Sequence, residues 1–245
     1  HRDLHSFPTR RSSDLIDDLH VEVRRSRRRR TVDLIVDRSG DVVINIPEAL
    51  PSQQLEAIVR EKQGWIYTKL DQKESVLTAG GRKEYVSGEG FYYLGKKYRL
   101  QLVNPEDVAA DTPPLKLLNG RFLMPRSAAA EGRHHFIKWY TQQGQEWIRQ
   151  AAEMLKDRVL ARPRSITVRD LKFRWGSCNP AGDVYFHWRV ILLPPKAVRY
   201  LILHELVHLH EHNHSPAFYE RLRRAVPNYS EIEAWLEANG DHYTL

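Results

Sequence analysis

The chain has 245 residues, long enough for one large or two small domains with a substantial hydrophobic core. Its formal net charge is +7, and no stretch approaches the roughly 18 apolar residues of a membrane span, so we expect no membrane partner. A single cysteine, Cys178, excludes an intramolecular disulfide, and no apolar signal-peptide segment is recognisable. We therefore expect a soluble, cytoplasmic protein.

Much of the positive charge is concentrated in one arginine run near the N-terminus. The run comprises Arg24, Arg25, Arg27, Arg28, Arg29 and Arg30. It could be a solvated strand edge whose charges prevent pairing with another strand. Alternatively, Arg27, Arg28, Arg29 and Arg30 could bind the phosphates of a nucleic acid. The sequence leaves both interpretations open, and the rest of the chain is close to neutral.

Residues 1–15 show neither a helical nor a strand period, and we expect them to be a disordered or non-native leader. Alternating apolar residues predict strands over 32–36 and 42–46, joined as a hairpin. Apolar residues at helical spacing predict a helix from Pro51 to Leu70.

Further strand patterns follow the predicted helix. We expect a hairpin over residues 85–103 and a short strand pair, 115–118 and 122–124, with its turn at Asn119-Gly120. These patterns therefore predict a β-rich N-terminal subdomain over residues 16–128 that contains one helix.

The remainder, residues 129–245, alternates helical and extended patterns, which makes the whole chain an α+β protein. A long helix is predicted over 128–160. A strand that begins at Ile166 leads into residues 174–178, and a turn over 179–183 joins it to another strand over 184–192, which makes a hairpin. An edge strand in this hairpin could pair with an extended peptide substrate, or the hairpin could simply support the next helix. That helix begins at Pro194-Pro195, and two short covering helices follow it.

The most specific motif is His204-Glu-Leu-Val-His208. Histidines four apart on a helix lie on one face, so His204 and His208 can bind one ion. Glu205 projects about 100° round the helix from His204, which places its carboxylate beside the ion. There it could accept a proton from water.

A catalytic zinc usually has three protein ligands, so a third ligand must come from elsewhere. The nearby candidates are His210, His212 and His214. Asn213 tolerates the left-handed conformation in which helices often end, and a turn there would bring His214 to the ion. We expect His210 and His212 to be surface residues.

These residues, together with Asn213-His-Ser215, Arg174-Trp-Gly-Ser-Cys178 and Phe186-His-Trp-Arg189, resemble the YgjP-like metallopeptidases, relatives of the SprT-like and Wss1-like proteases. The resemblance implies a zincin-like domain with an active-site helix, a short sheet and covering helices. It implies one Zn²⁺ bound by His204, His208 and His214, with Glu205 as the catalytic glutamate. His187 stands where the family pattern has asparagine, which bears on substrate contacts.

The expected function is zinc-dependent hydrolysis of a protein or peptide, with Glu205 as general base. Candidates for substrate contacts are Arg174, His187 and Arg189. Cys178 as a fourth ligand would make the site structural, and we expect a packed thiol instead. The alternatives are a zinc-stabilised nucleic-acid-binding module and a peptidase recruited to nucleic acid through the arginine run.

Overall fold

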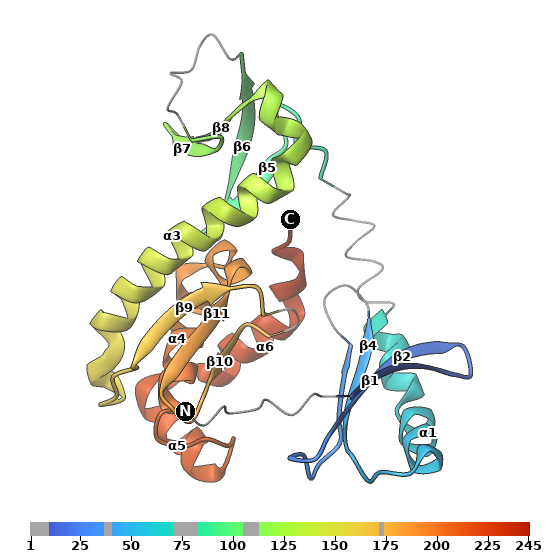
Figure 1. Ribbon diagram of the computed structural model, residues 1–245. Coiled ribbons are helices and arrows are strands. Elements are labelled where there is room, and N and C mark those ends of the chain that lie inside the picture. The colour runs from blue at the N-terminus through green and yellow to red at the C-terminus, as the bar shows by residue number, and fades with distance from the viewer. Residues whose placement is uncertain (1–9, 37–40, 71–82, 105–112, 172–173) are drawn as a thin grey trace, which may run out of the picture. The chain divides into compact units, whose positions relative to one another are not determined.

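The computed structural model describes residues 10–36, 41–70, 83–104, 113–171 and 174–245 (Figure 1). The chain forms two compact units, His1–Gly81 and Arg82–Leu245. Both units combine helices with small sheets, as the α+β expectation requires. In the described part of the chain, no helix is both long enough and apolar enough to cross a bilayer.

The first unit is a four-stranded sheet followed by a helix. Its strands are β1 (Arg10–Ile16), β2 (Leu19–Ser26), β3 (Asp33–Val36) and β4 (Val42–Pro47), in the order β1-β2-β4-β3. Strands β3 and β4 form the expected hairpin. Helix α1 (Ser52–Glu61) buries Leu55 and Val59 in the same core as Val21, Val23, Ile44 and Ile46. Helical structure resumes at residues 63–70 after a break at Lys62.

Strand β1 corrects the expectation of an unstructured leader over residues 1–15. It pairs with β2 from Arg10↔Arg25 to Ile16↔Leu19. Its side chains gave no sign of this, because Ser12, Ser13 and Leu15 are exposed and burial begins at Ile16. Main-chain hydrogen bonds therefore define the strand, and apolar periodicity cannot detect them. Residues 1–9 lie outside the described residues.

The second unit begins with another four-stranded sheet, called here the upper sheet. It contains β5 (Gly90–Tyr93), β6 (Lys96–Val103), β7 (Lys116–Leu118) and β8 (Arg121–Pro125), in the order β5-β6-β8-β7. Two antiparallel hairpins are joined by parallel pairing of β6 with β8, the arrangement also found in the first unit. Asn119 and Gly120 both have positive φ, as the predicted tight turn requires.

The upper sheet packs on the long helix α3 (Gly132–Leu155), so the structure divides the chain after Gly81 rather than near residue 128. Phe91 of β5 stacks on Phe136 of α3 with ring centroids 4.0 Å apart. At the β5–β6 turn, the Leu94 and Gly95 amides donate to Ile191 and Leu192 carbonyls at 2.8 and 3.0 Å. These contacts are distant in sequence, which is why strand patterns alone misplaced the boundary.

The rest of the second unit surrounds a three-stranded sheet. Its strands are β9 (Ser165–Arg169), β10 (Gly176–Cys178) and β11 (Asp183–His187), in the order β10-β11-β9. The 3-10 helices η2 (Arg126–Glu131) and η3 (Lys156–Arg158) flank α3 within the predicted 128–160 helix. Strand β11 ends at His187, and η4 (Trp188–Leu192) replaces the second half of the strand predicted over 184–192. Helices α4 (Pro195–Val207), α5 (Pro216–Ala225) and α6 (Tyr229–Asn239) complete the unit.

Candidate metal centre

Helix α4 carries the first two histidines of the site. Pro195 occupies its first turn, where a missing amide hydrogen costs nothing. Apolar residues bury the helix on several sides: Val198, Leu201, Ile202, Leu203, Leu206 and Val207. This burial fixes the helix, and with it the face that presents His204 and His208.

The helix ends earlier than expected. Its last α-helical residue is Val207, and His208 is the C-cap with φ −61° and ψ −16°. The expected left-handed stop at Asn213 is wrong, because Asn213 is not among the residues with positive φ. The chain instead turns after His208, with the His210 and Glu211 amides donating to the Val207 carbonyl at 3.0 and 3.1 Å.

The chain returns to the site just before α5. Ser215 is the N-cap of α5, and its hydroxyl accepts a hydrogen bond from the Phe218 amide at 3.3 Å. Pro216 occupies the first turn. These helix-starting features fix the backbone next to His214, so the position of the third histidine follows from local capping.

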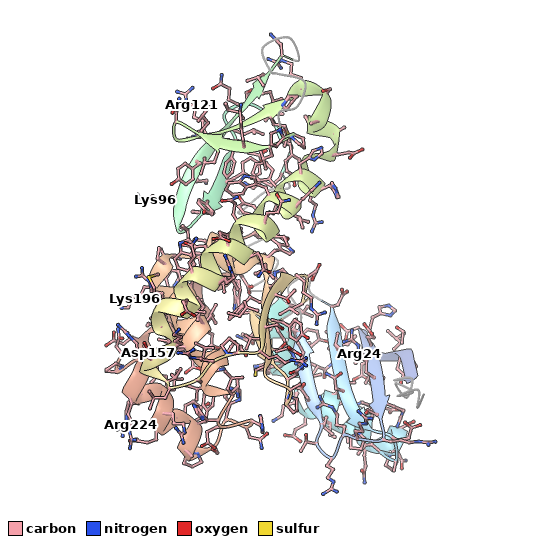
Figure 2. The ribbon with its side chains drawn as sticks, turned by 60° about the vertical axis from the view of Figure 1, so that its left-hand side comes forward. Arg24, Lys96, Arg121, Asp157, Lys196 and Arg224 are labelled. Atoms are coloured by element: carbon pink, nitrogen blue, oxygen red, sulfur yellow. The ribbon has the colours of Figure 1, made fainter. Side chains whose placement is uncertain are left out.

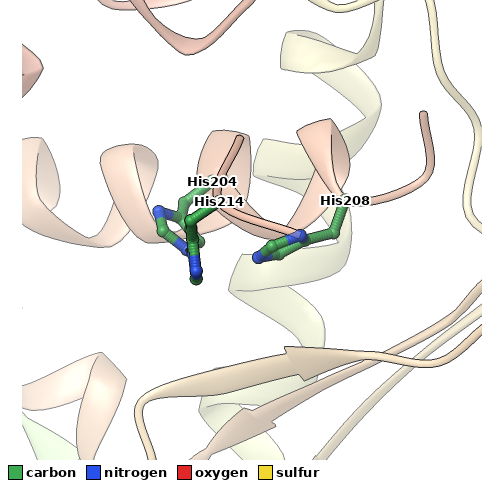
Figure 3. Close-up of side chains that lie close together, drawn as sticks. All are labelled: His204, His208 and His214. Atoms are coloured by element: carbon green, nitrogen blue, oxygen red, sulfur yellow. The ribbon is translucent and has the colours of Figure 1, made fainter. Parts of the chain in front are cut away.

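The three histidines meet in space, with one candidate ligand atom from each lying within 4.8 Å of the others (Figure 3). His204 Nε2 and His214 Nε2 are 3.0 Å apart. The ring of Phe218 lies against all three imidazoles, with centroid distances of 5.0, 4.6 and 4.6 Å to His204, His208 and His214. The Phe218 ring is therefore an aromatic floor for the cluster, meaning that it packs against all three imidazoles from one side.

Electrostatics keep these imidazoles neutral. Burial lowers the pKa of His204 to about 3, and it also lowers the pKa of His208 and of His214. His208 Nδ1 lies 2.9 Å from the Glu211 carbonyl oxygen, so Nδ1 carries the hydrogen and Nε2 is left with a lone pair. Neutral imidazoles whose second nitrogen is held by a carbonyl are the state in which histidine binds a metal ion.

Glu205 is buried beside this cluster, with 5% of its surface exposed. Burial raises the pKa of Glu205 to about 8, and the charge of Arg174 opposes that rise. Its Oε2 atom has no hydrogen-bond partner among the described residues. Such a buried carboxylate is well suited to exchange protons near neutral pH.

The neighbouring histidines and the cysteine lie outside the cluster. His210 is exposed, as expected, and its Nε2 lies 2.9 Å from the Val159 carbonyl oxygen, so it also anchors the loop. His212 is exposed. The thiol of Cys178 contacts the Asn179 carbonyl at 3.5 Å, and burial raises its pKa to about 11. Cys178 is therefore a protonated thiol outside the three-histidine group.

The three candidate substrate residues differ sharply in environment. His187 is 3% exposed, accepts a hydrogen bond from the Arg189 amide at 3.0 Å, and pairs with Asp170 at 3.2 Å. Arg189 is 6% exposed, and its Nε donates to the Tyr243 carbonyl at 3.0 Å. Both are thus held by internal contacts. Arg174 is exposed, and its charge reaches Glu205.

The arginine run does not form a continuous free patch. Arg24 donates to Glu22 at 2.7 Å, Arg25 donates to the Leu50 carbonyl at 2.7 Å, and Arg29 pairs with Asp33 at 3.8 Å. Arg27, Arg28 and Arg30 are exposed. Half of the run therefore stabilises the first unit.

Two contributors to the site had been given no role from the sequence. Phe218 supplies the aromatic floor, and Gly176 of β10 lies so close to Glu205 that an added Cβ would be 2.6 Å from Oε1. A glycine inside a predicted strand is a signal of close approach by another group, and that signal was present at Gly176.

Comparison with known proteins gives two findings. The family model of the YgjP-like metallopeptidase domain matches residues 30–239. Among solved structures, the chain is similar to the metallopeptidase zymogen of Pyrococcus abyssi abylysin, at 22% identity and a TM-score of 0.35, over 38% of this chain and 93% of that one. The comparison with curated proteins gives no significant match. Because the family match spans most of its length, the chain belongs to the YgjP-like metallopeptidase family.

Proposed function

We propose that this metallopeptidase hydrolyses peptide bonds with one zinc ion held by His204, His208 and His214, and with Glu205 as general base. The single observation that carries the proposal is the meeting of three neutral imidazoles beside a buried carboxylate. This donor set is one that zinc accepts in catalytic sites, where three protein ligands leave one position open.

The residues present fit a divalent cation. His204 Nε2 and His214 Nε2 lie only 3.0 Å apart, so both rings direct a nitrogen at the same region. His208 offers its Nε2 because its Nδ1 is held by the Glu211 carbonyl. A cation there would also favour the charged form of Glu205, whose pKa burial alone raises to about 8. The cluster and the carboxylate therefore complement one ion.

When bound, zinc would lower the pKa of a coordinated water towards about 7 and polarise a carbonyl group. Glu205 accepts the proton of the attacking water and returns it to the leaving amine. Its burial keeps the carboxylate in a low-dielectric position from which that transfer is effective. The three histidines remain neutral and fix the geometry.

Strand β10 is the surface we assign to the substrate backbone. It is the edge strand of its sheet, and Gly176 lies against Glu205. The His187 amide bonds the Trp175 carbonyl and the Asn179 amide bonds the Asp183 carbonyl, so 175, 177 and 179 face β11. Antiparallel pairing then leaves the main-chain groups of Gly176 and Cys178 directed to the open edge. An extended peptide can pair there, next to the general base.

A purely structural zinc site is the alternative, and the geometry favours it less. Structural sites usually close the ion with four protein ligands. In the described part of the chain the candidate ligand group contains three residues, and Cys178 is a neutral thiol outside it. Zincin-like catalysis also gives the buried Glu205 a role that a structural site leaves without purpose.

The test replaces Glu205 with glutamine and follows zinc and activity together. Glu205→Gln should keep one zinc per chain and lose hydrolysis of a quenched fluorescent peptide library by about 10²- to 10⁴-fold. The matched control is Glu211→Gln, which makes the same chemical change but leaves intact the main-chain carbonyl beside His208. Loss of zinc from a folded Glu205→Gln protein, or full activity in it, contradicts the proposal.

A further inference from the structure

The second unit carries most of the net charge of the chain. Residues 1–81 contain 14 lysines and arginines against 13 aspartates and glutamates, whereas residues 82–245 contain 24 against 18. The arginine run is thus balanced by acids within its own unit. A surface that attracts anions must be sought in the second unit, and the upper sheet provides one.

The two faces of the upper sheet differ completely. The inner face buries Phe91, Leu100, Phe122 and Met124 against α3. Alternation along the strands therefore directs Lys97, Arg99, Lys116 and Arg121 to the opposite face. We call these four residues the cationic face; Lys97, Arg99 and Arg121 are exposed and Lys116 is half-buried. Figure 2 shows Arg121 on the side of the sheet away from α3.

Among the residues that the structure describes, no acidic side chain pairs with the cationic face. None of its four residues forms an ion pair with a carboxylate that the structure describes. The strands β5, β6, β7 and β8 contain no aspartate or glutamate. Glu89, which precedes β5, instead pairs with Lys83 and accepts hydrogen bonds from the Tyr85 and Glu84 amides. Four positive charges therefore share one face, and no ion pair with a described carboxylate offsets them.

The arrangement of these charges suits a polymer of phosphates. Arg99 and Arg121 are register partners on adjacent strands, so their backbones are about 4.8 Å apart. Lys97 and Arg99 are two residues apart on β6 and project to the same face. Guanidinium groups bind phosphate in a bidentate manner and are weakly hydrated, which favours them at such contacts.

The same face also carries apolar surface between the charges. Leu118 of β7 is 46% exposed, and Leu123 of β8 is half-buried on the same side. Tyr92 of β5 lies beneath the Lys97 ammonium, whose nitrogen is 5.5 Å from the ring centroid. A duplex would direct only its phosphates here, whereas a single strand also offers unpaired bases to these apolar groups.

We infer that the cationic face of the upper sheet binds the backbone of single-stranded nucleic acid. The inference is independent of the metal centre, because none of its residues touches the histidine cluster. It places on Lys97, Arg99, Lys116 and Arg121 the nucleic-acid contact that the sequence had offered as one of two interpretations of the arginine run.

Two variants with the same change in net charge test the inference. One replaces Lys97, Arg99 and Arg121 with glutamine, and the other replaces Arg27, Arg28 and Arg30, which are also exposed. Binding of the full chain to a fluorescein-labelled single-stranded oligonucleotide is followed by anisotropy over a range of salt concentrations. Each lost phosphate contact should lower the logarithmic salt slope by about 0.7, so the first variant should lose about 2 from that slope.

The second variant should bind like the parent. Equal weakening in both variants would mean that net charge alone matters, and absence of binding at 50 mM salt by roughly micromolar protein would overturn the inference. The inference would also be overturned if polyglutamate displaced the labelled oligonucleotide as well as unlabelled single-stranded oligonucleotide does. Tighter binding of a duplex than of the single strand would overturn it too. Retained zinc content and thermal midpoint show that each variant is folded; if the triple variant does not fold, Arg121→Gln alone should lower the slope by about 0.7.

Discussion

Gly176 on β10 lies directly against Glu205 on α4, and a Cβ added to Gly176 would come within 2.6 Å of the Glu205 carboxylate. Gly176→Ala should therefore displace the Glu205 carboxylate, the proposed general base, while the three histidines stay in place. We expect kcat to fall at least about 10-fold with zinc content unchanged, since small displacements of reacting groups are costly. Gly182→Ala is not a useful control because Gly182 has φ +83°. Gly144→Ala is suitable, since its nearest neighbour is 3.4 Å away.

The three downstream histidines should differ in their effect on metal binding. His214→Ala should weaken zinc affinity by more than the about 10- to 100-fold typical of a residue that only supports a ligand. His212→Ala should be silent, because His212 is exposed. His210→Ala should lower the thermal midpoint without removing zinc, because it loses its contact with the Val159 carbonyl. Competition with a chelator measures the affinities, and a damaging His212→Ala would show that the third ligand is misassigned.

Substitution of the three candidate substrate residues should have two different effects. Arg189, which like His187 has internal contacts, should affect stability, whereas Arg174 should affect activity. Arg189→Gln leaves the Tyr243 carbonyl without its Nε donor, at a cost of about 1–3 kcal/mol in unfolding free energy. Arg174→Gln should leave that free energy unchanged and lower kcat/KM about 10-fold, the size expected for one removed charge-assisted contact. Urea unfolding and peptide kinetics on both variants make the comparison. A selective rise in KM for a fully stable Arg189→Gln protein would reverse the assignment.

Asp183 should control stability in acid. It accepts hydrogen bonds from Arg164 Nε at 2.7 Å, Ser165 Oγ at 2.8 Å and Asn179 Nδ2 at 3.1 Å. The guanidinium of Arg164 and these donors hold the pKa of Asp183 well below its usual range. The carboxylate therefore stabilises the fold above its unfolded pKa of about 3.9, and that contribution is lost as the pH falls towards the lower folded value.

Asp183→Asn should accordingly lower the thermal midpoint at pH 7 and make its decline below about pH 4 shallower. Metal-free protein is used throughout, so that loss of zinc in acid does not enter the comparison. Asp157→Asn, at an exposed aspartate, is the control. Identical acid dependence in Asp183→Asn and the parent would show that the network is not coupled to folding.

The sequence predicted the meeting of His204, His208 and His214 better than it predicted the domain boundary. The spacing of His204, Glu205 and His208 constrains one helix face, so local geometry was sufficient there. The stop after Val207 could not be read from the sequence because no glycine or asparagine marks it. The division after Gly81 depends on packing such as Phe91 on Phe136, between residues far apart in the chain. The internal contacts of His187 and Arg189 could not be predicted for the same reason, since their partners are distant in sequence.

The short connection between His208 and His214 has a consequence for how the protein acquires its metal. One histidine closes α4 and the other immediately precedes the cap of α5, so both ends of the loop are already fixed by helices. The conformational entropy of the chain around the three histidines is therefore lost during folding, before any ion binds. In small zinc domains, by contrast, metal binding and folding are one event. Here a chelator should remove zinc without unfolding the chain, and added zinc should rebind to it. One folded protein molecule could therefore lose and regain its metal repeatedly.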